Sequence, residues 1–179
     1  MKVYLARHGQ TVWNRRDVVC GRTDIPLTEK GLQQARELAE QVADTPVDLI
    51  LASPLQRAQQ TAQAVAERIH VPIVTEPLLL EQNFGDYEEA GRFDEEYMAY
   101  RKDFFRRFPG GGESIAMVTT RAYTLIDKLR TQYGDRCVLL VSHGAFCRCF
   151  RTYFEDVPNE AFYQWRMGNC ELVEYELTE

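Results

Sequence analysis

Two of the three histidines in this chain stand in the same local setting. His8 and His143 each follow an apolar run and precede a glycine. Arg7 stands directly before His8, and a guanidinium group matches the oxygens of a phosphate or a carboxylate in a rigid fork. The pattern predicts a site for an anionic substrate. An exposed polar turn after a strand is the alternative that Arg-His-Gly alone leaves open, because short motifs recur by chance.

The elements expected around these residues explain how they could meet. Residues 2–6, 47–52 and 136–142 are mainly apolar and predict strands. The carboxyl ends of parallel strands converge on one rim, where open α/β sheets place their ligands. His8, Arg57 and His143 would lie on that rim, and helix amino termini add partial positive charge and free N–H groups there. Together with Arg7 they predict an anion cradle of phosphate size.

The remaining pattern alternates helices with strands. Thr28 is predicted to cap a helix that begins near Glu29, Ser114 to cap one that runs to about Tyr133, and Ser53 with Pro54 to start another. Residues 71–75 and 171–177 predict strands at the sheet edges, the first because Pro72 lacks an N–H donor. Strands that alternate with helices favour a mainly parallel α/β sheet with right-handed crossovers.

The segment from about 78 to 112 departs from this alternation. Residues 93–108 predict a helix rich in aromatic side chains, which suits either core packing or a lid over a pocket better than a cofactor box. Residues 109–112, Pro-Gly-Gly-Gly, break the chain. We therefore expect one domain over residues 1–179, with an inserted lid-like helical segment at about 78–112.

Composition narrows the class of protein. The chain has 179 residues, a net charge of −6 and a pI of about 5.2, so neither a nucleic acid nor an anionic membrane is implied as a partner. Five cysteines without a Cys-x-x-Cys pair make a disulfide framework unlikely, and Cys147 and Cys149 suit small apolar positions. With no run long enough to span a membrane, we expect a cytoplasmic protein.

Three other chemistries fit the residues less well. Two histidines with Glu81 or Asp24 could bind a metal, but arginines flank the same positions and would repel a cation, so we expect no metal and no cofactor. Ser53 and Ser142 lack the Gly-x-Ser-x-Gly elbow of a serine nucleophile. No strand precedes the glycines of residues 110–112, as a nucleotide-binding loop would require.

Six ordered blocks of the chain resemble the histidine phosphatase superfamily, also called the phosphoglycerate mutase-like family. The blocks are Leu5-Ala-Arg7-His8-Gly9-Gln10-Thr11, Gly21-Arg-Thr-Asp24-Ile-Pro-Leu-Thr28-Glu-Lys-Gly31, Ser53-Pro-Leu-Gln-Arg57-Ala-Gln-Gln-Thr61-Ala, Leu80-Glu81-Gln-Asn-Phe84-Gly85-Asp-Tyr87-Glu88, Gly111-Gly112-Glu113-Ser114 and Val141-Ser142-His143-Gly144. Six blocks in the family's order are far more specific than any one of them. The resemblance implies a three-layer α/β/α sandwich.

The resemblance also implies roles for individual residues. His8 would be the nucleophile that becomes a phosphohistidine, and Glu81 would protonate the leaving oxygen, with Glu88 as the next candidate for that acid. Arg7, Arg57 and His143 would hold the phosphoryl oxygens. The implied substrate-binding residues are Gly9, Gln10, Thr11, Asn14, Cys20, Gly21, Thr23, Gly144 and Ala145.

Three functions from different classes follow. The first is a phosphatase that hydrolyses a small phosphorylated metabolite, the second is a phosphoglycerate mutase with the same core, and the third is an inactive module that binds a phosphorylated ligand. A mutase must shield its phosphohistidine from water. This chain has one candidate cover, at about 78–112, and only two residues after the final predicted strand, so phosphatase is favoured. The identity of the substrate and assembly into a homodimer stay open.

Overall fold

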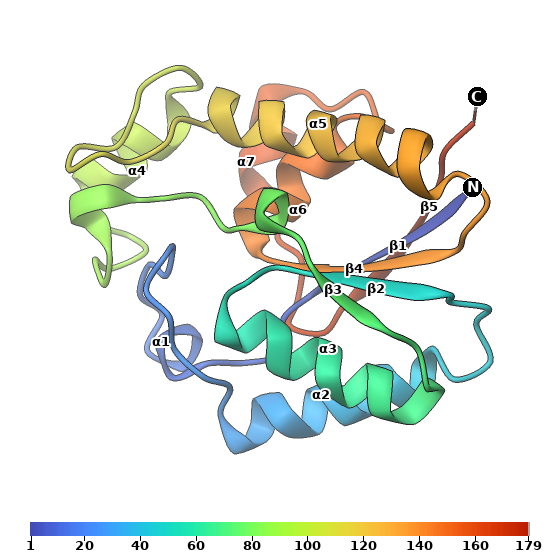
Figure 1. Cartoon of the computed structure of the whole chain (residues 1–179). Helices are drawn as coiled ribbons and strands as arrows, with labels where there is room; N and C mark the ends of the chain where they lie inside the picture. Colours follow the sequence, from blue (N-terminus) through green and yellow to red (C-terminus); the bar gives the residue numbers. More distant parts are fainter. Residues whose placement is uncertain (179) are drawn as a thin grey trace.

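A five-stranded sheet runs through the computed structural model, which describes residues 1–178 (Figure 1). The strands are β1 (Lys2–Arg7), β2 (Leu49–Ala52), β3 (Ile73–Thr75), β4 (Val138–Ser142) and β5 (Leu172–Glu176). Their order is β3-β2-β4-β1-β5, and only β5 runs antiparallel to its neighbour. The mainly parallel sheet and the two predicted edge strands are therefore confirmed.

Helices cover both faces of the sheet (Figure 1). One face carries α2 (Glu29–Gln41) and α3 (Gln56–Ile69), and the other carries α5 (Ile115–Tyr133), α6 (Gly144–Arg151) and α7 (Asn159–Gln164). The remaining elements are α1 (Val12–Arg15), α4 (Glu95–Lys102), η1 (Pro77–Leu79) and η2 (Gly85–Tyr87). This is the expected three-layer α/β/α sandwich. Within the described residues no helix is both long and apolar enough to cross a membrane.

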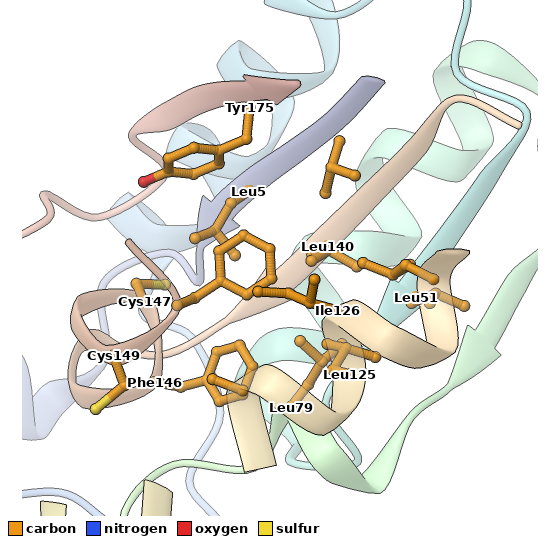
Figure 2. Close-up of a cluster of buried hydrophobic side chains, with 14 of the residues drawn as sticks. Leu5, Leu51, Leu79, Leu125, Ile126, Leu140, Phe146, Cys147, Cys149 and Tyr175 are labelled. Atoms are coloured by element: carbon orange, nitrogen blue, oxygen red, sulfur yellow. The ribbon is translucent and has the colours of Figure 1, made fainter. Parts of the chain in front are cut away.

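Strand β1 shows how the sheet is fixed between its two helical layers. Leu5 belongs to the buried cluster under α5 and α6, whereas its neighbours Tyr4 and Ala6 belong to the cluster under α2 and α3. Figure 2 shows Leu5 and Leu140 from adjacent strands in the same cluster as Phe146 of α6. Because successive side chains of a strand point to opposite faces, slipping β1 by one residue would exchange the two sets. The positions of the strand ends are thus determined by the core.

Two predicted helix caps are confirmed and one is wrong. The hydroxyl of Thr28 accepts the N–H of Gly31, and Ser114 caps α5 in the same way. Ser53 does not cap α3, which begins only at Gln56. Asp24 replaces it, since its carboxylate accepts the N–H of Gln56 at 2.7 Å. A side chain that is distant in sequence therefore satisfies this helix end, and Ser53 is free for another contact.

The segment at 78–112 is less helical than predicted. Only residues 95–102 form α4, and Asp94 caps it through the N–H of Tyr97 at 2.8 Å. The aromatic side chains divide: Tyr97 and Phe108 are buried, while Phe93 and Phe105 are 71% and 80% exposed. One continuous helix from 93 to 108 would bring Phe93 and Phe105 onto the same face as the buried Tyr97 and Phe108. Because α4 ends at residue 102, the exposed and the buried aromatic side chains are separated.

Two short helices, α1 and α7, are not predicted by the sequence analysis. Both are six residues or shorter, so their apolar spacing carries little helical signal.

Candidate active site

The ends of β1 and β4 bring the two histidines of the sequence pattern together. The N–H of His8 donates to the carbonyl oxygen of Ser142 at 3.0 Å, which continues the parallel pairing one residue past the end of β1. The imidazole rings of His8 and His143 lie 5.1 Å apart between centroids. The predicted convergence on one rim of the sheet is thereby confirmed.

The hydrogen bonds of His8 determine which ring nitrogen can react. Its Nδ1 lies 2.7 Å from the carbonyl oxygen of Gly9. A carbonyl only accepts, so Nδ1 carries the proton and Nε2 keeps its lone pair. Burial, followed by the positive charges of Arg57 and Arg7, holds the pKa of His8 well below its usual value. His8 is therefore neutral, and its Nε2 has the form that a nucleophile needs.

His143 and Arg57 form a pair behind His8. Arg57 donates from Nε to Nδ1 of His143 at 3.2 Å, which leaves the proton on Nε2, 2.7 Å from the hydroxyl of Ser53. Burial first, then Arg57, lowers the pKa of His143 well below its usual value. Both side chains are fully buried, and neither lines the cavity beside His8. Direct contact of either with a phosphoryl oxygen therefore stays a prediction.

Arg7 faces the cavity with a free donor. Its Nη1 donates to the carbonyl oxygen of Met167 at 2.6 Å. Its Nε is buried and has no hydrogen-bond partner among the described residues. A buried N–H without an acceptor is costly, and an anionic oxygen would satisfy it. A methyl group added to Gly144 would lie 3.8 Å from this nitrogen, which places the backbone of Gly144 beside it.

Glu81 lies at the amino terminus of α6, next to the same glycine. Its two carboxylate oxygens accept the N–H of Ala145 at 3.1 and 3.2 Å, and one of them accepts that of Phe146 at 3.3 Å. A methyl group on Gly144 would lie 3.9 Å from Glu81 Oε2. Arg7 and Glu81 thus lie on the same side of Gly144, with a guanidinium and a carboxyl group near each other.

The loop that carries Glu81 is held by residues that the sequence analysis does not predict. Arg22 donates from Nε to the carbonyl oxygen of Glu81 at 2.7 Å, and Arg121 of α5 donates to that of Leu80 at 2.9 Å. Glu113 pairs with both arginines, at 3.1 Å and 3.0 Å. Glu113 lies in one of the six blocks, but nothing in the sequence pairs it with Arg121.

Four of the nine predicted substrate-binding residues line the cavity: Asn14, Cys20, Gly144 and Ala145. Asn14 closes a capping box with Thr11, whose N–H donates to the Asn14 amide oxygen at 3.0 Å. Because that oxygen is occupied, the NH₂ group of Asn14 remains as a donor toward the cavity. Thr11 itself is buried and does not line the cavity.

Gly9 and Gln10 pack against α2 and do not line the cavity. A Cβ on Gly9 would lie 2.5 Å from the carbonyl oxygen of Gly31, so close backbone packing requires this glycine. The backbone N–H of Gln10 donates to the Gln34 side chain at 2.9 Å. Both residues hold the loop after β1 in place instead of facing a ligand.

Gly21 and Thr23 also lie outside the cavity lining. Their carbonyl oxygens accept Nη2 and Nη1 of Arg57, at 2.7 and 2.9 Å. Glu88 accepts the N–H of Gly21 at 3.2 Å and the Thr23 hydroxyl at 2.7 Å. The carboxylate of Glu88 thus holds this loop and does not line the cavity, whereas Glu81 does line it.

The cavity measures about 90 Å³ and holds more arginines than the sequence analysis predicts. The unpredicted lining residues are Val19, Gln82, Phe84, Arg92, Tyr97, Met98, Arg101, Arg148, Arg166 and Met167. Arg148 follows Gly144 by one helical turn on α6, so spacing could have indicated it. Arg92, Arg101 and Arg166 come from segments without such a signal.

No group of three metal-ligating side chains forms among residues 1–178. The alternative that joins Asp24 to the histidines does not match the geometry, because the Asp24 carboxylate accepts an N–H at the start of α3. The third histidine, His70, is exposed at the end of α3 in a left-handed conformation with φ 58°.

Comparison with known proteins gives the class of this protein. A family model of the histidine phosphatase superfamily (branch 1) matches residues 3–179. The chain therefore belongs to this superfamily, as the six sequence blocks predict. Arg7, His8 and Glu81 line one cavity, and the ring of His143 lies behind that of His8.

Its relatives carry the names of different activities. The chain is 33% identical to a probable phosphoglycerate mutase, GpmB, of Yersinia pestis (strain Pestoides F), over 98% of this chain and 86% of that protein. It resembles the crystal structure of the α-ribazole phosphatase from Shigella flexneri with a TM-score of 0.87 and 29% identity, over 100% of this chain and 92% of the other.

A phosphoserine phosphatase from Entamoeba histolytica, in complex with 3-phosphoglyceric acid, is similar with a TM-score of 0.84 and 30% identity, over 97% and 89% of the two chains. Phosphatases and a mutase are thus both similar to this chain. The names support an enzyme of this superfamily and do not separate the two activities.

Proposed function

We propose that this protein is a phosphatase that hydrolyses small phosphomonoesters through a phosphohistidine on His8. The observation that carries the proposal is the state of His8: Nδ1 is engaged by Gly9, Nε2 keeps its lone pair, and Arg7 presents an unpaired donor beside it. A neutral nucleophile next to fixed positive charge suits attack on a phosphoryl group.

The reaction has two displacements. In the first, Nε2 of His8 forms a bond to phosphorus while the ester oxygen leaves with its electron pair and takes a proton from Glu81. In the second, water attacks phosphorus, its proton passes to Glu81, and the bond from phosphorus to nitrogen breaks. Arg7 and Asn14 line the cavity, so the guanidinium would neutralise the phosphoryl oxygens and the amide NH₂ would donate to them. Charge neutralisation and positioning dominate phosphoryl transfer.

Arg57 and His143 support this centre from behind. The Arg57 charge helps to keep His8 neutral, and its hydrogen bonds hold the 21–23 loop.

Access to the site favours hydrolysis over transfer to a second acceptor. The cavity shares Met98, Arg101 and Arg166 with a neighbouring groove of about 610 Å³ between α4 and α7, and Arg166 is exposed there. Water can therefore approach along this groove, whereas a mutase must shield the phosphohistidine. The mutase remains the second candidate because several relatives are named as probable phosphoglycerate mutases.

Phosphate release from a panel of phosphomonoesters tests the proposal. We expect release that survives exhaustive chelation, because the positive charge comes from arginines, and strong inhibition by vanadate, a five-coordinate phosphorus mimic. Loss of activity with a chelator, restored by zinc or magnesium, would contradict the proposal. No release from any ester would favour the third function, an inactive module that binds a phosphorylated ligand.

A separate assay distinguishes the mutase. The protein receives 3-phosphoglycerate with a trace of 2,3-bisphosphoglycerate, and both 2-phosphoglycerate and free phosphate are followed. We expect phosphate to appear faster. Faster formation of 2-phosphoglycerate would assign the chain to the mutase reaction.

A further inference from the structure

Three arginines of the cavity lining lie near one another, and two of them also line the groove between α4 and α7; we call this side of the cavity its outer end. They are Arg101 of α4, Arg148 of α6 and Arg166, which follows α7, and we call them the arginine cluster. Their segments are distant in sequence, and all three side chains line the same cavity as His8 and Glu81. The fold therefore concentrates positive charge in the cavity that also holds His8 and Glu81.

No carboxylate neutralises this cluster. None of the ion pairs within residues 1–178 includes Arg101, Arg148 or Arg166. Arg92, which lines the same cavity, differs because it pairs with Asp17 at 3.2 Å. Glu81 lies at the inner end on α6 amide groups, and Glu160 lines only the neighbouring groove.

Burial makes the unpaired charge costly. Arg101 and Arg148 are each only 8% exposed. Arg101 donates to the carbonyl oxygen of Tyr163 at 2.8 Å and Arg148 to that of Trp165 at 3.3 Å, so each guanidinium still has unused donors. Burial, with Arg148 and Arg166 nearby, lowers the pKa of Arg101 to about 10, so it stays charged at neutral pH.

The structure assigns the arginine cluster as a subsite for a second anionic group on the substrate. The inference rests on the proposed function and narrows it: the preferred substrate is a phosphomonoester that carries a carboxylate or a second phosphate on its leaving group. Guanidinium groups bind both anions through charge-assisted hydrogen bonds. Any remaining part of such a substrate would extend past Arg101 and Arg166 into the groove between α4 and α7.

Matched substrate pairs test the subsite. Glycerol 3-phosphate and 3-phosphoglycerate differ by a hydroxymethyl against a carboxylate, and fructose 6-phosphate and fructose 1,6-bisphosphate differ by a hydroxyl against a phosphate. We expect kcat/KM to favour the member with the second anion by roughly tenfold or more in at least one pair, the usual scale of a charged hydrogen bond. The pair in which kcat/KM differs shows whether the subsite binds a carboxylate or a phosphate.

Charge-removing variants locate the effect. Arg166→Gln and Arg148→Gln should each reduce the preference within the responding pair several-fold, since each removes one guanidinium. Arg166 is exposed and makes no hydrogen bond within the described chain, so its variant should fold. Arg107→Gln is the matched control: Arg107 is exposed in the same part of the molecule and lines neither cavity, so its variant should keep the preference.

Two results would overturn the inference. One is equal kcat/KM within both pairs, and the other is a preference that Arg166→Gln and Arg148→Gln both leave intact. Calorimetric binding of the same four compounds keeps this test separate from catalysis. If no compound releases phosphate, the proposed function fails, and the subsite is then judged by the ratio of dissociation constants within each pair.

Discussion

The two ends of the active-site cavity differ in how far their charged groups are bound by other protein groups. At the inner end, the Nδ1 of His8 and the carboxylate of Glu81 bind protein atoms, and Arg57 and His143 are held behind them by hydrogen bonds. The Nε of Arg7 is one donor there without a partner among residues 1–178. At the outer end, the arginine cluster of Arg101, Arg148 and Arg166 forms no ion pair with a carboxylate of the described residues. Most inner groups are thus held by the protein, whereas the outer arginines leave charge for a ligand.

The difference suggests a division of labour. Groups that must hold one protonation state and one orientation are fixed by surrounding hydrogen bonds, which is how a site stabilises a transition state without rearranging. Groups that choose among substrates need free donors instead, because specificity comes from contacts that only the right ligand completes. Changes at the inner end should therefore affect all substrates, and changes at the outer end only some.

The largest effect is expected from His8→Ala. Removing the nucleophile should lower kcat on every phosphomonoester by roughly 10⁴-fold or more. Acid-labile, base-stable phosphate on the peptide that contains His8 should be found when the native enzyme is quenched during turnover, and it should vanish in the variant. An adduct on another peptide, or activity retained in His8→Ala, would contradict the role of His8.

Glu81→Gln should produce the next largest effect, and one that depends on the leaving group. A placed general acid contributes roughly 10²–10⁴-fold, so kcat on alkyl phosphates should fall by that amount. Hydrolysis of p-nitrophenyl phosphate should fall much less, because nitrophenolate leaves without a proton. Equal losses on both substrates would mean that Glu81 is structural.

Arg121→Met should give a smaller effect with the same dependence on the leaving group. Arg121 holds the Glu81 loop through Leu80 and Glu113, and slight misplacement of a catalytic group can cost up to about 10²-fold. We expect alkyl phosphate hydrolysis to slow by roughly ten- to a hundredfold, with less loss on p-nitrophenyl phosphate. Arg130→Met, an exposed position of the same helix, is the control and should show no such dependence.

The smallest effect concerns stability and pH. His8 and His143 are buried with pKa values well below normal, so below about pH 6.5 the unfolded chain binds protons that the folded chain does not. Above that pH both histidines are neutral in the folded and the unfolded chain. As the pH falls below it, the unfolded chain gains protons and the free energy of unfolding decreases. Each histidine adds up to about 1.4 kcal/mol per pH unit to the slope of the free energy of unfolding.

Urea denaturation between pH 7.5 and 5 measures this slope. His8→Gln should make it shallower by up to one proton, whereas His70→Gln, at an exposed position, should leave it unchanged. An unchanged slope in His8→Gln would show that His8 is protonated in the folded protein at acidic pH.

The sequence by itself determined the inner end of the site. His8 and His143 follow apolar strands, and the carboxyl ends of parallel strands must share a rim, so a local pattern was enough to bring the two residues together. The same argument placed Arg7 and Arg57 on that rim, and the six family blocks assigned a role to Glu81. The positions of these residues follow from strand periodicity and short connections, both of which can be recognised in a sequence.

Only the tertiary structure decided how those residues are held and what surrounds them. Asp24 caps a helix 32 positions away, Glu113 pairs with an arginine 91 positions before it, and Arg101 donates to a carbonyl 62 positions after it. The arginine cluster likewise joins α4, α6 and the segment after α7. Such contacts arise because packing on the two faces of the sheet brings distant segments together. In the sequence alone, each arginine is indistinguishable from an ordinary solvent-exposed side chain.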